Sequence, residues 1–325
     1  MNITCRICEG AAHFRPVAVR GGKPMTLWHC SSCDFDFFAH DPTEGLIADK
    51  LDQTRLQAAG LDIPTVERDF ANGLRQSMPY IEEYMDASDR DRNILEIGCS
   101  WGYFLKLVQD AGAKPHGVEL NAVRTGYVND KLGIPCDGSL DECEKRGIRF
   151  KKIFMFYVLE YVSQPVGYLQ RLADLLDGDG KLILITPSLR DPLKDIWRNT
   201  GFANFFYDEH AINYFSPLSA NRLVDRVHAG KSFVSTRQGY SFANHVSWFL
   251  TGAPRTTGVV GGDNFVKDIV SQLRAAPRAK KWAFTADSSD AAAHLANMIQ
   301  DFDIAYKQYL ESQQLGNQIR MIICK

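Results

Sequence analysis

NILEIGCSWGYF (Asn93–Phe104) is the stretch that decides the fold of this 325-residue chain. The apolar NILEI is typical of a buried strand, and Gly98 and Gly102 indicate a glycine turn leading into a helix, an arrangement that usually holds nucleotide-like cofactors. A dinucleotide site requires G-x-G-x-x-G, but Ser100 and Tyr103 occupy the second and third glycine positions. The missing glycine normally lets the backbone approach a pyrophosphate, so NAD is excluded. Ser100 is expected to cap the N–H groups of the following helix.

The residues after this stretch repeat its strand-then-helix order. Between Asn93 and about Gly239, helical patterns separate five apolar runs, which are NILEIG, KPHGVEL, IPCDG, KKIFMFYVL and GKLILITPS. Strands that alternate with helices form a parallel, doubly wound sheet. Ligands of such sheets bind at the carboxyl ends of the strands. The sequence therefore predicts an α/β domain with its site at that edge.

The motifs of this domain resemble those of a known family. Glu-Ile-Gly-x-Ser-x-Gly (Glu96–Gly102) resembles motif I of the class I S-adenosylmethionine-dependent methyltransferases. YVLEYVSQP, LLDGDGKLILITPS and DEHAINYFSPLSANRLVDRV resemble later segments of zinc-ribbon members of that family, in the same order. The resemblance covers roughly residues 1–50 and 93–240, and it implies a seven-stranded sheet and S-adenosylmethionine as cofactor. Two residues depart from the family pattern. Lys151 replaces an acidic residue before strand four, and Tyr161 replaces the histidine of VLEHV.

The resemblance also assigns the cofactor residues. Glu119 ends the second strand, 21 residues after Gly98, where an acidic side chain would accept hydrogen bonds from both ribose hydroxyls. The segment DGSL, residues 137–140, lies where the family has its adenine pocket. The expected cofactor-binding residues are Glu96, Gly98, Ser100, Gly102, Glu119, Leu120, Gly138, Ser139, Leu140 and Tyr157.

Three residues are candidates for the chemistry. Methyl transfer is an in-line displacement, and it needs a base only if the acceptor arrives protonated. His210 is the candidate base, because an imidazole titrates near neutral pH and Asp208 and Glu209 flank it; alternatively, it holds a loop together. The resemblance places Tyr157 and Tyr161 at the end of strand four, facing the methyl group. There they would bind an acceptor oxygen, or simply pack in the core.

The first forty residues contain two C-x2-C pairs, Cys5 with Cys8 and Cys30 with Cys33. Two such turns supply the four thiolates of a tetrahedral zinc site, with no position left open for water or substrate. The short strands between them, broken by glycine and proline, predict a structural zinc ribbon over residues 1–44. His13 and His29 are the only plausible substitute ligands.

Three further segments complete the expected domain organisation around a cofactor-binding core at residues 93–239. Residues 45–92 have helical spacing and would form a preface that covers the cofactor. Residues 240–316 are expected to be a helical insertion that builds the acceptor pocket or a homodimer contact, or else a separate C-terminal domain. Residues 317–325, which contain the apolar QIRMIICK, would be the last, antiparallel strand of the core sheet.

Composition limits the function classes. The formal net charge of −2 creates no global field that favours a polyanion. The chain also lacks an apolar run of the roughly 18–20 residues that span a membrane, and a signal peptide. These features predict a cytoplasmic protein. The family resemblance implies an enzyme (EC 2.1.1) that methylates a small molecule, such as a sugar or a natural-product intermediate, at oxygen or carbon. The alternatives are an RNA methyltransferase that docks nucleic acid on its ribbon, and a non-catalytic binding scaffold.

Overall fold

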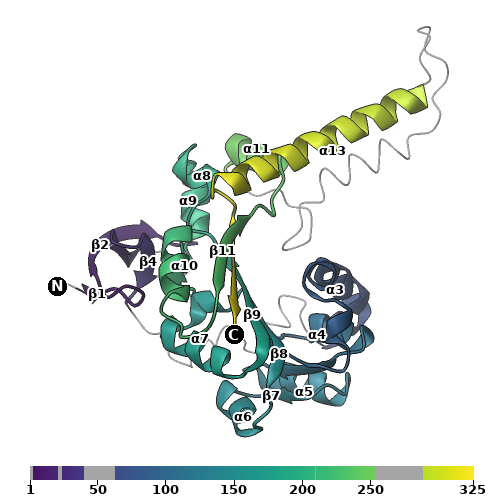
Figure 1. Cartoon of the computed structure of the whole chain (residues 1–325). Coiled ribbons are helices and arrows are strands. Elements are labelled where there is room, and N and C mark those ends of the chain that lie inside the picture. Colours follow the sequence, from purple (N-terminus) through teal and green to yellow (C-terminus); the bar gives the residue numbers. More distant parts are fainter. Residues whose placement is uncertain (1–2, 21–23, 40–62, 209, 254–287) are drawn as a thin grey trace.

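A seven-stranded sheet lies at the centre of the molecule, with helices on both sides (Figure 1). The computed structural model describes residues 3–20, 24–39, 63–208, 210–253 and 288–325. In sheet order, the strands are β11 (Ser232–Arg237), β12 (Gln318–Cys324), β9 (Leu176–Pro187), β8 (Phe150–Phe156), β5 (Asn93–Ile97), β6 (Lys114–Val118) and β7 (Cys136–Asp137). β12 is antiparallel to both of its neighbours, and the other pairs are parallel. The expected doubly wound sheet is confirmed.

The central strands are continuous apolar runs because helices cover both faces of the sheet. Ile94 and Phe154 pack on one face with the helices α3 and α4, and Leu95 and Ile153 pack on the other with α6, α7 and α10. All four side chains are fully buried, and each such burial contributes roughly 1.5–3 kcal/mol. The covering helices are α3 (Ile63–Tyr84), α4 (Tyr103–Asp110), α5 (Ala122–Asp130), α6 (Leu140–Lys145), α7 (Pro165–Asp174) and α10 (Pro217–Val224).

The N-terminal segment forms a second, antiparallel sheet that includes a strand from the core. Its strands, in order, are β1 (Ile3–Thr4), β2 (Ala11–Ala18), β3 (Pro24–Cys30), β4 (Phe35–Phe38) and β10 (Asn213–Tyr214). β10 pairs with β4 through Asn213 opposite Phe37 and Tyr214 opposite Asp36. The ribbon is therefore built onto the core rather than tethered beside it.

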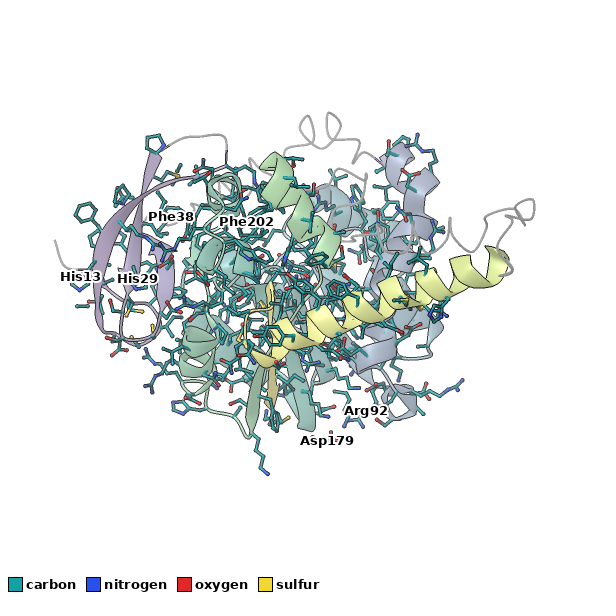
Figure 2. All side chains as sticks on the ribbon, turned by 90° about the horizontal axis from the view of Figure 1, so that it is seen from above. His13, His29, Phe38, Arg92, Asp179 and Phe202 are labelled. Carbon is teal, nitrogen blue, oxygen red and sulfur yellow. The ribbon has the colours of Figure 1, made fainter. Side chains whose placement is uncertain are left out.

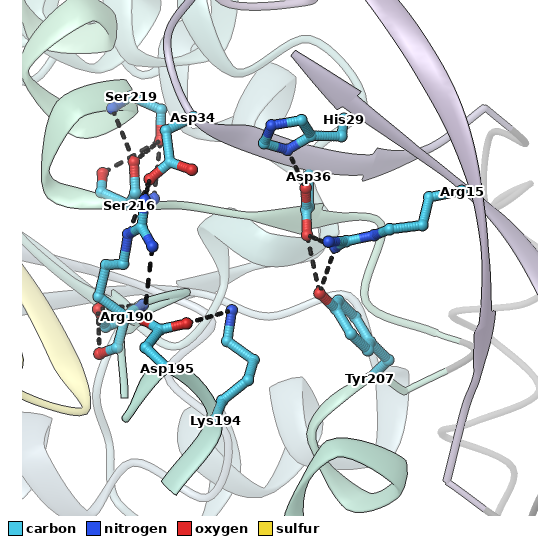
Figure 3. Close-up of polar contacts among 11 residues, drawn as sticks. Arg15, His29, Asp34, Asp36, Arg190, Lys194, Asp195, Tyr207, Ser216 and Ser219 are labelled. Atoms are coloured by element: carbon cyan, nitrogen blue, oxygen red, sulfur yellow. Dashed lines mark hydrogen bonds and ion pairs between the residues drawn. The ribbon is translucent and has the colours of Figure 1, made fainter. Parts of the chain in front are cut away.

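A buried carboxylate strengthens this junction (Figure 3). Asp36 accepts hydrogen bonds from Arg15 at 2.6 Å and from the hydroxyl of Tyr207 at 2.8 Å, and it lies 2.7 Å from Nδ1 of His29. Burial alone would raise the pKa of Asp36, but the His29 hydrogen bond and the Arg15 charge outweigh it and lower that pKa. The hydrogen bond to Asp36 in turn raises the pKa of His29. Because Tyr207 belongs to the core, these contacts join the two sheets.

The described parts of the segment between β11 and β12 contain two helices. These are α11 (Phe242–Thr251) and α13 (Ser288–Ser312), and α13 extends away from the sheet (Figure 1). The predicted helix FVKDIVSQL and residues 45–62 of the expected preface lie outside the described residues. None of the described helices has the length and apolar character that crossing a membrane demands.

Candidate active site

The turn after β5 is built from left-handed backbone. Gly98, Ser100 and Gly102 have φ angles of 72°, 51° and 77°, a region that favours glycine. A Cβ at Gly98 would lie 2.4 Å from Cγ2 of Val158, so a side chain there would clash. The prediction that Ser100 caps α4 is wrong. Gly102 is the N-cap and, as a glycine, offers no side-chain cap, while Ser100 lies in the turn two residues earlier.

Glu119 fixes this turn from the end of β6. Its Oε2 accepts the N–H of Ser100 and its Oε1 accepts the N–H of Asn121, both at 2.9 Å. An ionised carboxylate offers about four acceptor positions, so each oxygen keeps capacity for a ribose hydroxyl. Leu120, the next residue, is 61% exposed and offers an apolar surface to a planar base. These features fit the ribose and adenine of S-adenosylmethionine.

Glu96 is a buried residue of β5, and one of its carboxylate oxygens could accept a further hydrogen bond. Its Oε2 is buried and, within the described part of the chain, has no hydrogen-bond partner. Burial raises the pKa of Glu96 well above its usual value, and the nearby charge of Glu119 raises it further. A buried polar atom of this kind calls for a partner. The ammonium and hydroxyl groups of S-adenosylmethionine are suitable donors, so Glu96 also fits the cofactor.

The expected adenine pocket follows β7. Gly138 donates its N–H to Oε2 of Glu142 at 2.9 Å, and Ser139 caps α6 by accepting the N–H of Glu142. Leu140 is buried on the first turn of that helix. Apart from Glu96, which lies within β5, the expected cofactor residues therefore follow the carboxyl ends of β8, β5, β6 and β7, which are consecutive in the sheet. One edge of the sheet brings them together.

A cavity of about 810 Å³ opens beside this edge. Tyr157 connects the two regions, since it follows β8 and also lines the cavity. Its φ of 56° is left-handed, and burial raises its pKa well above the usual value. Seven of the described lining residues are aromatic, namely Tyr80, Tyr103, Tyr157, Phe202, Phe205, Phe206 and Tyr240.

One carboxylate stands among the described residues that line the cavity. Asp191 follows β9, is 1% exposed, and caps the short helix α8 (Pro192–Asp195) by accepting the N–H of Leu193 at 2.8 Å. Burial raises the pKa of Asp191 to about 7, against the lowering effect of that hydrogen bond. Sequence reasoning missed this residue. The one available signal was an aspartate soon after the last parallel strand.

His210 and Tyr161 lie at the junction of the ribbon and the core. Nδ1 of His210 is 2.9 Å from Oδ1 of Asp208, which also accepts the His210 N–H. Tyr161 packs in a cluster with Val19 and Leu27 of the ribbon. Neither residue is among the described residues that line the cavity. The catalytic roles of His210, Tyr161 and Tyr157 all stay predictions, although Tyr157 follows β8 and lines the cavity.

The four cysteines of the ribbon converge on one point. The Sγ atoms of Cys5, Cys8, Cys30 and Cys33 all lie within 4.8 Å of one another, with the pairs Cys5–Cys33 at 3.6 Å and Cys8–Cys30 at 3.5 Å. Tetrahedral zinc with Zn–S bonds of about 2.3 Å needs sulfurs about 3.8 Å apart, so the cluster fits the ion. His13 and His29, the suggested substitutes, lie on the ribbon strands (Figure 2) and are not part of this group.

Comparison with known proteins points to the same domain. A family model described as a methyltransferase domain matches residues 69–227. One similar solved structure is a SAM-dependent methyltransferase from Archaeoglobus fulgidus (11% identity, 81% of this chain and 100% of that one, TM-score 0.46). Another is coclaurine N-methyltransferase bound to N-methylheliamine and SAH (12%, 78% and 72%, TM-score 0.43). No curated protein matches the sequence. Residues 69–227 of this chain, which hold β5 to β9 and the turn over Glu119, thus match the model of a methyltransferase domain.

Proposed function

We propose that this protein transfers a methyl group from S-adenosylmethionine to a small molecule that binds in the aromatic cavity. The observation that carries the proposal is the position of Tyr157, which ends β8 beside the expected cofactor residues and also lines the cavity. A volume of about 810 Å³ lies within the usual range of small-molecule sites. A sugar or another natural-product intermediate is the acceptor that we favour.

The positions of Glu119, Glu96 and the aromatic cavity residues suggest a role for each in methyl transfer. S-adenosylmethionine would supply an electrophilic methyl group on its sulfonium. Glu119 would bind the ribose, while Glu96 accepts a hydrogen bond from the cofactor with the buried oxygen that now lacks one. The aromatic wall would exclude water and align the acceptor, which is the main source of rate in a displacement of this kind.

Asp191 is the group that we propose as proton acceptor. The other titratable side chains among the described lining residues are arginines and tyrosines. An arginine stays protonated, and a tyrosine is a weak base because its phenolate is scarce at neutral pH. A carboxylate whose pKa is about 7 is suited to general base catalysis. The proposed acceptor atom is therefore a hydroxyl oxygen.

The proposal is tested by calorimetry on the purified, metal-loaded protein. We expect S-adenosylhomocysteine to bind and NAD to show no comparable affinity, because the turn lacks the glycines that a pyrophosphate needs. A panel of hydroxylated small molecules is then incubated with the enzyme and S-adenosylmethionine. The compound that supports formation of S-adenosylhomocysteine (SAH) is the acceptor. A protein that binds no S-adenosylhomocysteine would refute the proposed function.

Replacing Glu119 tests the position of the ribose. Glu119→Ala should weaken S-adenosylhomocysteine binding by roughly 1–3 kcal/mol, since it removes charged hydrogen bonds. The matched control is Asp110→Ala, which removes an exposed carboxylate from the far end of α4. Thermal unfolding checks that the turn still folds. Equal affinities of Glu119→Ala and wild type would mean that the ribose binds elsewhere.

A further inference from the structure

One residue of the zinc ribbon lines the cavity. Arg20 follows β2, and it contributes to the wall together with Phe205, Phe206 and Tyr240. Its backbone N–H donates to the carbonyl oxygen of Tyr207 at 2.7 Å, so the end of the ribbon strand is attached to the core at this point. The ribbon thus reaches the space that the methyl acceptor would occupy.

The side chain of Arg20 is held in place by one aromatic residue of α9 (Thr200–Phe206). Its Cζ lies 4.0 Å from the ring centroid of Phe205, and its Nε donates to the Phe205 carbonyl oxygen at 3.2 Å. Stacking of this kind orients a guanidinium and leaves its edge available. In the described part of the chain, the Nε bond is the hydrogen bond that the Arg20 side chain makes. Four Nη–H donors therefore remain for a ligand.

Among the described residues, the carboxylate that pairs with Arg20 is that of Asp208, and this ion pair is long. Nη1 of Arg20 is 3.6 Å from Oδ2 of Asp208, beyond hydrogen-bonding distance, and the Arg20 side chain is 51% exposed. Arg75 is a second cation on the wall, and the acidic residue among the described lining residues is Asp191. Burial raises the pKa of Asp191 to about 7, so its negative charge is incomplete at neutral pH. The wall therefore carries a net positive charge.

We propose that Arg20 binds an oxyanion of the methyl acceptor, a carboxylate or a phosphate, so that the zinc ribbon forms part of the acceptor site. A guanidinium binds either group through two parallel hydrogen bonds. The aromatic wall takes the apolar or planar body of the acceptor. This inference rests on the proposed function, because it defines the acceptor of that same cavity.

Calorimetry with simple probes tests the inference on zinc-loaded, SAH-loaded protein. The probes are 4-hydroxybenzoate, its neutral methyl ester, and phenyl phosphate. We expect an anion to bind at least tenfold more tightly than the ester, and the stronger of the two anions identifies the preferred group. In Arg20→Gln this preference should disappear. Arg20→Lys should keep part of it, because the charge remains while the paired geometry is lost.

The control is Arg68→Gln, which removes an exposed arginine on α3 that pairs with Asp69, and it should bind the probes as wild type does. Zinc content and circular dichroism confirm that each variant is folded. Equal binding of ester and anions, undiminished preference in Arg20→Gln, or no binding of any probe would each overturn the inference. A separate titration of S-adenosylhomocysteine into cofactor-free protein distinguishes failure of this inference from failure of the proposed function. Absence of that binding in wild type would contradict the methyltransferase proposal, whereas normal binding of S-adenosylhomocysteine without the anion preference would contradict only the role of Arg20.

Discussion

Cys30→Ser is expected to lose its metal and the ordered structure of the ribbon while the seven-stranded sheet stays folded. Structural zinc sites contribute about 10–16 kcal/mol in isolated fingers. The ribbon strands themselves bury too few apolar residues to fold alone. The wild-type protein should contain about one zinc per chain, and the variant much less. Elemental analysis measures the metal, and hydrogen exchange or limited proteolysis locates the loss of order in residues 3–39.

Two further readouts make this prediction specific. Cys324→Ser, on β12 and outside the cluster, should keep its zinc. Affinity for S-adenosylhomocysteine should change little in Cys30→Ser, because the expected cofactor residues follow β5 to β8. Acceptor binding should fall, since the ribbon carries Arg20. Stoichiometric zinc in Cys30→Ser, with normal exchange protection, would contradict the ribbon hypothesis.

The parts of the fold that the sequence predicted are those that local pattern determines. Runs such as KKIFMF and KLILIT are apolar at consecutive positions because both faces of a parallel sheet are buried. The two C-x2-C pairs indicated a metal cluster because short turns place both sulfurs of a pair at one point. Glu119 was identified by its distance from Gly98. Each signal lies within a few dozen residues and repeats a known motif.

The parts that were missed depend on contacts between distant segments. Asn213 and Tyr214 form a strand only because β4, more than 170 residues earlier, offers an edge. Asp191 resembles any helix-capping aspartate in sequence, and folding alone buries it in the cavity wall. His210 drew attention because acidic residues flank a histidine in the sequence, but its ring is held by Asp208 at the ribbon junction.

In the expected insertion, helical periodicity predicted an apolar face but not what that face contacts. The expected apolar face of α13 exists, but Leu295, Met298, Phe302 and Tyr309 on it are largely exposed. Tyr306 instead approaches His245, with its hydroxyl 2.5 Å from Nδ1. Helical spacing predicted the face correctly, yet spacing does not specify a partner. The homodimer through residues 240–316 therefore stays a prediction.

Asp191→Asn is expected to lower turnover by a factor of about 10²–10⁴ with little change in cofactor affinity, the scale of losing a general base. Asparagine is as good an N-cap as aspartate, so the hydrogen bond from Leu193 and the start of α8 should be kept. SAH formation is measured with an acceptor identified in the hydroxyl panel. Asp195→Asn, which changes a neighbouring carboxylate on the same helix, is the matched control and should retain most activity.

The pH dependence has a definite sign. The base must be ionised, so wild-type turnover should rise with pH through about 7, the raised pKa of Asp191, and Asp191→Asn should lack this rise. Stability should change in the opposite direction. Between pH 4 and 7 the unfolded chain has released the proton that folded Asp191 retains, so wild type loses stability relative to Asp191→Asn as pH rises. Lys194, Asp195, Tyr240 and Tyr306 act on this site and are unchanged in the variant.

His210 competes with Asp191 for the role of proton acceptor, and a rise of turnover with pH does not by itself tell which of the two residues is the base. The variants do. If Asp191 is the base, His210→Ala should keep turnover within a few fold, since its ring lies against Asp208 and outside the described cavity wall. If His210→Ala lowers turnover by a factor of about 10² or more while Asp191→Asn stays active, the base is His210. Asp191 would then serve only as the N-cap of α8. An effect of His210→Ala on the KM of the acceptor alone would indicate that the ribbon junction positions the acceptor without taking its proton.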